Sequence, residues 1–156
     1  MNITCISIGL TKEPEYQKFI SFYENKINFY NNFKYVEYPV LKNSNKFDAK
    51  KLKEEEGKFI LSKIPPKSYV IILDELGKTM SSKSFSKYLE KKNMSGHKEV
   101  FFVIGGAFGF SSDVYSRANE KIALSEMTFT HQMVRVIFLE QLYRGFSILK
   151  GEKYHH

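Results

Sequence analysis

The sequence predicts an α/β fold with a mostly parallel central sheet, and three observations lead to this prediction. Two short segments, residues 69–73 and 100–104, are apolar without alternation, as in strands that helices cover on both faces. Segments with helical periodicity lie between the apolar strands along the chain. A glycine-rich stretch, residues 105–109, directly follows the second apolar strand, and open α/β sheets bind their ligands at such strand ends.

The first half of the chain predicts two strands and two helices. We expect, in order, a strand over residues 3–9, an amphipathic helix over 11–29, a strand over 33–40, a polar loop over 41–46 and a charged helix over 47–64. Apolar residues of the first helix, Phe19 and Ile20 among them, recur at spacings of three and four and are expected in the core. The mixed charge run from Lys50 to Lys58 is typical of a solvated helix face.

The second half predicts three strands and three helices. We expect a strand over 69–73, a polar loop over 74–78, a helix over 81–92, a strand over 100–104, a helix over 112–119, a short strand over 122–124 and a long helix from Thr130 to about Lys150. Apolar residues of the last helix point in nearly every direction, so we expect burial all round. In a chain of this size, the simplest cover is a second copy across a two-fold interface.

Size and composition indicate one cytosolic domain spanning residues 1–156. The formal net charge of +7 is compatible with a polyanionic partner, and equally with an ordinary lysine-rich surface. The single cysteine, Cys5, can form no internal disulfide, which fits a reducing compartment. The N-terminus lacks the pattern of a signal peptide. The longest nearly apolar run, residues 100–110, is shorter than the roughly 18 to 20 residues that span a bilayer, so we expect no membrane segment.

No constellation for nucleophilic or metal catalysis is present in the sequence. A metal site from the adjacent pair His155 and His156 is disfavoured because neighbouring ligands are rare, so we expect no metal. The glycine stretch does not have the spacing of the dinucleotide-binding fingerprint. It still brings backbone groups close to a ligand ahead of a helix start. We expect this glycine loop and a second loop, residues 124–129, to hold one cofactor.

Five motifs in a fixed order carry a resemblance over essentially the whole chain. They are LDxxGK from Leu73, VIGGxxG from Val103, SxMTFTHQMVRV from Ser125, EQLYR from Glu140 and the ending YH from Tyr154. The chain thus resembles the RlmH family, the ribosomal large-subunit pseudouridine N3-methyltransferases of the SPOUT class.

The resemblance implies a SPOUT-type α/β methyltransferase fold whose C-terminal part, about residues 70–156, forms a deep trefoil knot. It implies S-adenosyl-L-methionine as the cofactor, a homodimer with the last helix at the interface, and action on a pseudouridine of 23S rRNA in the assembled ribosome. The implied cofactor contacts are Leu73, Gly105, Leu124, Ser125, Glu126, Met127, Thr128 and Phe129.

Methyl transfer to the N3 atom of pseudouridine requires that N3 lose its proton. The candidate catalytic residues are His131, Arg135, Tyr154 and His155. His131 could instead hydrogen-bond a loop at the helix start. Arg135 and Arg144 could form ion pairs, and Glu140 lies at the i,i+4 spacing that favours a pair with Arg144. Arg135 and the tail are the predicted RNA contacts, and the base is unassigned.

Two other functions compete with this one. A non-catalytic rRNA- or ribosome-binding protein on the same fold would keep the basic surface, with Phe108 closing the cofactor site. A small nucleotide-binding oxidoreductase is suggested by the order of strand and glycine loop, but the acidic residue that binds ribose in such enzymes is missing.

Overall fold

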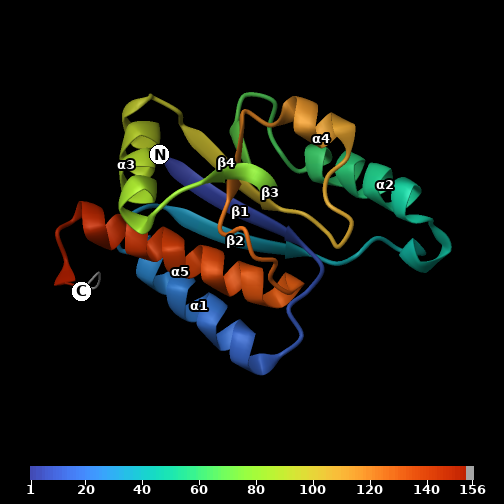
Figure 1. Ribbon diagram of the computed structural model, residues 1–156, viewed down its shortest axis with the longest axis horizontal. Coiled ribbons are helices and arrows are strands. Elements are labelled where there is room, and N and C mark those ends of the chain that lie inside the picture. The colour runs from blue at the N-terminus through green and yellow to red at the C-terminus, as the bar shows by residue number, and fades with distance from the viewer. Residues whose placement is uncertain (154–156) are drawn as a thin grey trace.

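The central sheet has five strands that all run parallel, in the order β2-β1-β4-β3-β5. The computed structural model describes residues 1–153 (Figure 1). The strands are β1 (Asn2–Ile8), β2 (Phe33–Tyr38), β3 (Tyr69–Thr79), β4 (Glu99–Ile104) and β5 (Glu120–Ala123). The helices are α1 (Pro14–Asn28), α2 (Ala49–Ser62), α3 (Ser82–Met94), α4 (Ser112–Arg117) and α5 (His131–Leu149), with a short 3-10 turn, η1 (Ser44–Lys46). The predicted α/β class with a parallel sheet is confirmed.

Helices cover both faces of the sheet, which explains the apolar strands without alternation. Along β4, Val100, Phe102 and Ile104 belong to the core shared with α1, α3 and α5. Phe101 and Val103 belong to the second core, under α2 and α4. Because full burial of such a side chain contributes ~2 kcal/mol, this one strand stabilises both layers.

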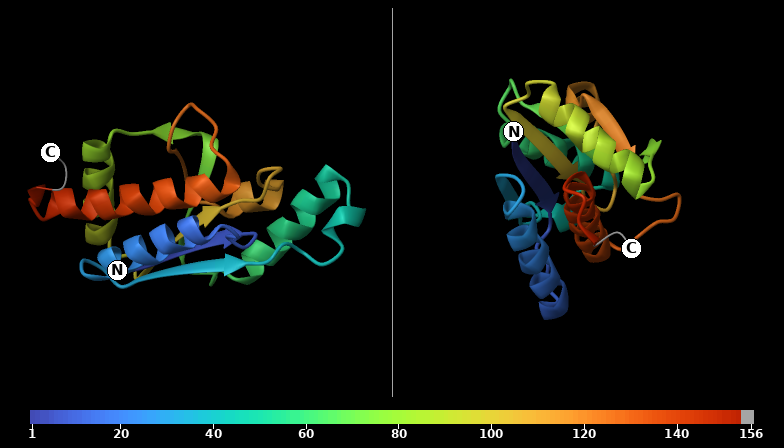
Figure 2. Two further views of the ribbon diagram at one scale, coloured as in Figure 1. Left: turned by 90° about the horizontal axis from the view of Figure 1, so that it is seen from below. Right: turned by 90° about the vertical axis from the view of Figure 1, so that its left-hand side faces the viewer.

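Helix α5 lies beside α1, as the views in Figures 1 and 2 agree. Its sheet-facing residues Phe138, Leu139 and Leu142 are completely buried. Other apolar residues of α5, such as Ile137, remain partly exposed, so a single chain does not bury the helix all round. The prediction for Phe19 is wrong, because α1 turns Ile20 and Ile27 toward the sheet and leaves Phe19 52% exposed.

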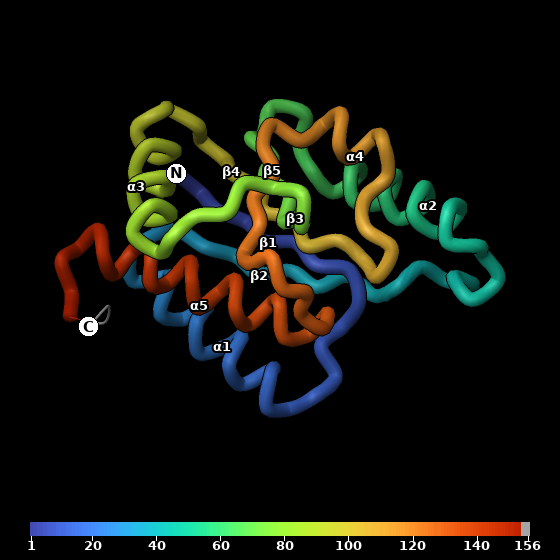
Figure 3. Tube along the Cα trace, viewed as in Figure 1, coloured from blue at the N-terminus to red at the C-terminus, as the bar shows by residue number. Residues whose placement is uncertain are grey.

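Strand β3 is longer than the sequence predicts. The expected loop after Leu73 is instead a continuation of β3 to Thr79, which pairs with β5 through Lys78 and Ile122 after an irregularity. Gly77 makes this pairing possible, because a Cβ there would lie 2.5 Å from the backbone carbon of Ile122. In Figure 3, the chain between β5 and α5 passes behind the segment that joins β3 to α3. The trefoil knot itself stays a prediction.

Candidate active site

Three neighbouring strands, β3, β4 and β5, end at one cleft. Carboxyl ends of parallel strands meet at the same edge of a sheet, where ligands commonly bind. The cleft has a volume of about 700 Å³, within the range of small-molecule sites. Its walls come from the end of β3, the glycine loop after β4, the second loop after β5, the first turn of α5 and one side chain each of α2 and α4. The two loops that the sequence assigns to one cofactor therefore face one space.

Seven of the eight predicted cofactor residues line this cleft. They are Leu73, Gly105, Leu124, Ser125, Met127, Thr128 and Phe129. Glu126 is exposed and does not line it. The Ser125 hydroxyl oxygen accepts a hydrogen bond from the Met127 N–H at 2.9 Å, a local turn that leaves Glu126 at its outer position.

The glycine loop lies directly on a buried aromatic ring. Phe110 is 4% exposed, and a Cβ on Gly105 would lie 2.9 Å from the Phe110 ring. At the end of the loop, the Gly109 N–H donates to the Gly106 carbonyl oxygen at 3.2 Å. Phe108 is 53% exposed at the edge of the cleft and leaves it open. The backbone of the glycine loop thus packs on the Phe110 ring and is accessible from the cleft.

Charges of both signs surround the cleft. Asp74 and Glu75 follow the buried part of β3, and Lys53 reaches the lining from α2. The Tyr115 hydroxyl donates to the Asp74 carboxylate at 2.5 Å. Burial and this carboxylate raise the pKa of Tyr115 to about 12, so the hydroxyl remains a donor at neutral pH. The cleft therefore suits a ligand that carries both a cationic and an anionic group.

His131 is the first residue of α5 and lines the same cleft. Burial lowers the pKa of His131 below its ordinary value of 6.5, and the nearby positive charge of Arg135 lowers the pKa further. The imidazole is therefore mostly neutral at pH 7, and one ring nitrogen is able to accept a proton.

Arg135 lies one turn further along α5 and points away from the cleft. Its guanidinium is 2% exposed and donates to the Ile8 carbonyl oxygen at 2.9 Å, to the Thr11 hydroxyl at 2.9 Å and to the Glu37 carboxylate at 3.3 Å. Among residues 1–153, the buried Arg135 Nε atom has no hydrogen-bond partner. Gly9, at a φ of 90°, leaves room for the guanidinium, because a Cβ there would lie 3.2 Å from Nη2.

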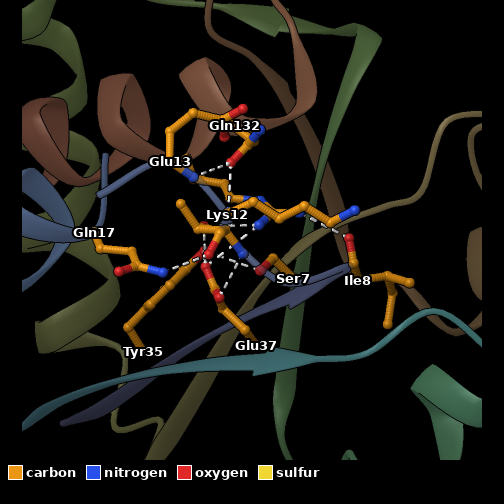
Figure 4. Close-up of polar contacts among 10 residues, drawn as sticks. Ser7, Ile8, Lys12, Glu13, Gln17, Tyr35, Glu37 and Gln132 are labelled. Carbon is orange, nitrogen blue, oxygen red and sulfur yellow. Dashed lines mark hydrogen bonds and ion pairs between the residues drawn. The ribbon is translucent and has the colours of Figure 1, made fainter. Parts of the chain in front are cut away.

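Further hydrogen bonds around this arginine join Glu37 and Gln132 to the loop between β1 and α1 (Figure 4). Glu37 accepts from the Thr11 N–H at 2.8 Å and from the Tyr35 hydroxyl at 3.1 Å. The Gln132 side-chain oxygen accepts from the backbone N–H of Lys12 at 2.8 Å. We call Arg135, Glu37, Thr11 and Gln132 the Arg135 clamp. The clamp fills the carboxyl ends of β1 and β2 with protein groups.

The predicted catalytic residues are not gathered in one place. His131 lines the cleft, whereas Arg135 is buried in the clamp, a placement that does not support the predicted RNA contact. Tyr154 and His155 lie outside the described residues. Arg144 donates to Glu140 at 2.6 Å, the ion pair that the i,i+4 spacing favours.

Sequence reasoning missed the part of α2 that reaches the site. Lys53 lines the cleft, and Glu56 is 5% exposed, with its carboxylate against Gly106. Burial raises the pKa of Glu56. Gly57 was the available signal, because a glycine inside a helix indicates close packing, and a Cβ there would lie 2.1 Å from the Ser111 hydroxyl. The interpretation of the charge run over residues 50–58 as a solvated face is therefore wrong at Glu56, which is buried.

Residues 1–153 contain neither a membrane-spanning helix nor a group of side chains placed to hold a metal ion. None of the helices in this range is long and apolar enough to cross a membrane. Within the same range, no group of three or more histidine, cysteine, aspartate or glutamate side chains is placed to hold a metal ion.

Comparisons with known proteins agree with this arrangement. The family described as "Predicted SPOUT methyltransferase" matches residues 1–155. A protein of Flavobacterium psychrophilum named "Ribosomal RNA large subunit methyltransferase H" is 51% identical over all of this chain and 99% of its own length. Proteins of the same name from Christiangramia forsetii and Parabacteroides distasonis are 47% and 45% identical, again over all of this chain and 99% of their own lengths.

Proposed function

The chain belongs to the SPOUT methyltransferase family, and from this premise we propose that it methylates large-subunit ribosomal RNA. One observation carries the proposal: the glycine loop, the second loop and His131 line a single cleft of about 700 Å³. Relatives named as ribosomal RNA large subunit methyltransferases, 42–51% identical over the whole chain, support the RNA substrate.

The cleft fits S-adenosyl-L-methionine, which would be the methyl donor. This ligand has an apolar adenine face, an amino group and a carboxylate. The apolar lining suits the base, Asp74 and Glu75 suit the amino group, and Lys53 suits the carboxylate. Backbone groups of Gly105 and of the second loop would complete the contacts, because no side chain at Gly105 blocks their approach.

Within this RNA, the proposed target is a pseudouridine of 23S rRNA in the assembled ribosome. A cytoplasmic homodimer would methylate it at N3. Exposed apolar groups support the dimer: Phe19 and Phe22 of α1 are 52% and 50% exposed, and Met133 and Ile137 of α5 are partly exposed. Each is a large apolar side chain whose burial against a second copy would stabilise the assembly.

The protein's own residues would carry out few chemical steps. When bound, the cofactor supplies an electrophilic methyl group. The two loops would hold it in one orientation, and alignment of donor and acceptor accounts for much of the rate. The neutral imidazole of His131 would take the proton that leaves N3, as the N3–methyl bond forms. The tail residues Tyr154 and His155 are proposed to contact the RNA.

The test is methyl transfer to large ribosomal subunits by the wild type and by His131→Ala. We expect His131→Ala to lower kcat by at least ~100-fold, the usual contribution of a general base, with cofactor affinity changed by less than about threefold. His97→Ala is the matched control, because His97 packs against Tyr69 at the opposite end of β3. Deletion of residues 154–156 should also lower the rate while cofactor binding remains.

Two results would contradict this proposal in different ways. A wild type that binds the cofactor but methylates no ribosomal RNA would remove the proposed function. A His131→Ala variant as active as the wild type would remove only the assignment of the base.

A further inference from the structure

We propose that Arg135 is a positioning residue, which together with Gln132 fixes the first turn of α5 so that His131 faces the cleft. This inference rests on the proposed function, because His131 is the proton acceptor there. It assigns a role to a buried cation that the cleft itself does not use.

Arg135 connects α5 to three other parts of the chain. Its guanidinium donates to the last residue of β1 (Ile8), to the loop that follows (Thr11) and to β2 (Glu37). Thr11 is 4% exposed, so these bonds form away from water. Charge-assisted hydrogen bonds in such surroundings are the strong ones, and the planar guanidinium fixes their directions. One residue of α5 is thereby held against two strands and a loop.

Gln132 supplies a second point of attachment on the same turn. Its side-chain oxygen accepts from the Lys12 N–H at 2.8 Å and from the Glu13 N–H at 3.4 Å (Figure 4). The loop that carries these two N–H groups is also bonded to α1, because the Gln17 side chain donates to the Thr11 carbonyl oxygen at 2.8 Å. Two attachments three residues apart define one face of the helix and oppose its rotation about its axis.

The cleft residues of α5 alternate with the clamp residues. His131 and Val134 line the cleft, whereas Gln132 and Arg135 belong to the clamp. Successive residues of an α-helix point about 100° apart, so attachment of one pair sets the direction of the other. A rotation or shift of the first turn would move the imidazole, and a misplacement of about 1 Å can cost ~100-fold in rate.

The charge of Arg135 acts on the same histidine. Burial is the first cause of the lowered pKa of His131, and the Arg135 cation is the second. Charged and titratable groups that line the cleft around His131 come from α2, β3 and α4, and they are Lys53, Asp74, Glu75 and Tyr115. Because substitution of Arg135 leaves all four in place, a change in the pKa of His131 reports the loss of the Arg135 charge, whereas a fall in kcat reports the loss of positioning.

The experiment compares Arg135→Met, Arg135→Lys and Gln132→Ala. Arg144→Met is the matched control, because Arg144 also lies on α5 and pairs with a carboxylate, Glu140. The pKa of the His131 imidazole is measured by NMR titration without cofactor or RNA. The pH profile of methyl transfer to ribosomal subunits is measured separately, with kcat and KM for both substrates.

We expect Arg135→Met to raise the pKa of His131 and to move the acid limb of kcat to higher pH. Its kcat should fall by at least ~10-fold, with KM for the cofactor changed by less than about threefold. Arg135→Lys keeps the positive charge but loses the planar arrangement of donors in the guanidinium. The pKa of His131 should therefore stay low, while kcat recovers only in part. Gln132→Ala removes one attachment without a buried charge, and should lower kcat with no change in the pKa of His131.

The outcomes separate this inference from the proposed function. If Arg135→Met has the kcat and the His131 titration of the wild type, Arg135 has no positioning role. Should Arg135→Met not fold, a wild-type kcat of Arg135→Lys leads to the same conclusion. If Arg144→Met shifts both readouts as much as Arg135→Met, the effect is general and the inference also fails. An inactive wild type would overturn the proposed function, and the NMR titration would still test whether the clamp acts on His131.

Discussion

The two halves of the sheet's carboxyl edge differ in what occupies them. At the ends of β1 and β2, the Arg135 clamp fills the space with protein hydrogen bonds, and Arg135 and Thr11 are almost completely buried. At the ends of β3, β4 and β5, the glycine loop and the second loop surround a cleft of about 700 Å³. The first turn of α5 separates the halves and contributes residues to both.

This difference shows how a fold with five equivalent strand ends acquires one site. Every parallel strand presents backbone groups at the carboxyl edge, so a ligand could bind beside any of them. Arg135 satisfies such a group at β1 with a donor from α5, whereas Gly105, directly after β4, has no side chain and lines the cleft. Substitutions in the two halves should therefore have different consequences, for stability in one and for binding in the other.

The largest effect is expected in the clamp. Glu37→Leu removes the carboxylate that pairs with the buried Arg135 guanidinium, and we expect the free energy of unfolding to fall by about 3 kcal/mol. Urea denaturation measures it. Glu55→Leu breaks the exposed pair with Lys58 and should leave the midpoint unchanged. Equal decreases in the free energy of unfolding for the two substitutions would mean that burial of the Arg135–Glu37 pair does not increase its contribution to stability.

The next effect belongs to the cleft. Gly105→Val places methyl groups against the buried Phe110 ring, so the glycine loop must move. Overpacking of this kind costs about 1–3 kcal/mol, and we expect the affinity for S-adenosylhomocysteine to fall by about 10- to 100-fold in calorimetric titration. An unchanged affinity would place the ligand elsewhere.

Gly9→Ala is the counterpart of that substitution in the closed half. Gly9 has a φ of 90°, and its Cβ would lie 3.2 Å from the Arg135 guanidinium. We expect a loss of about 1–2 kcal/mol in the free energy of unfolding, with the affinity for S-adenosylhomocysteine unchanged. A fall in that affinity as large as for Gly105→Val would contradict the division into two halves.

A smaller effect is expected at the acidic wall of the cleft. Tyr115→Phe removes the hydroxyl that donates to Asp74 Oδ2, while the Leu76 N–H still donates to Oδ1 of the same carboxylate at 2.9 Å. The lost hydrogen bond corresponds to about 0.5–1.5 kcal/mol, so affinity for S-adenosylhomocysteine should change by about 2- to 10-fold. Glu126→Gln, outside the lining, should bind as the wild type does; a larger effect there would show that the exposed position of Glu126 changes on binding.

The smallest effect is expected at the edge of the cleft. Phe108 is 53% exposed, so Phe108→Ala should change cofactor affinity by less than about threefold. The same calorimetric titration measures it. If the ring instead closed the site, as a non-catalytic relative would require, the substitution would strengthen binding by more than ~10-fold.

Local patterns predicted most of the fold. Strand β4 and helix α5 follow from an apolar run and from a long apolar segment after Thr130, because both signals are contained in consecutive residues. The extension of β3 could not be predicted in this way. Residues 74–78 resemble a polar turn, and their strand structure depends on pairing with β5, more than 40 residues later.

The residues of the candidate site differ in the same way: some follow from local sequence patterns, and others depend on distant partners. The glycine loop and the second loop were predictable, because each directly follows a strand. Arg135 was not, because its partners Thr11 and Glu37 are about 100 residues away and a helical arginine usually lies at the surface. Glu56 was hidden in a run of charges for the same reason: its burial depends on the distant Gly106.

The most direct test of this account is amide hydrogen exchange with and without S-adenosylhomocysteine. We predict that exchange slows in the glycine loop and the second loop on binding, while residues 9–13, the loop that the clamp holds, are protected in both states. Protection that appears on binding in residues 9–13, with residues 105–109 and 124–129 unchanged, would contradict it, because the ligand would then occupy the half of the sheet edge that the clamp fills.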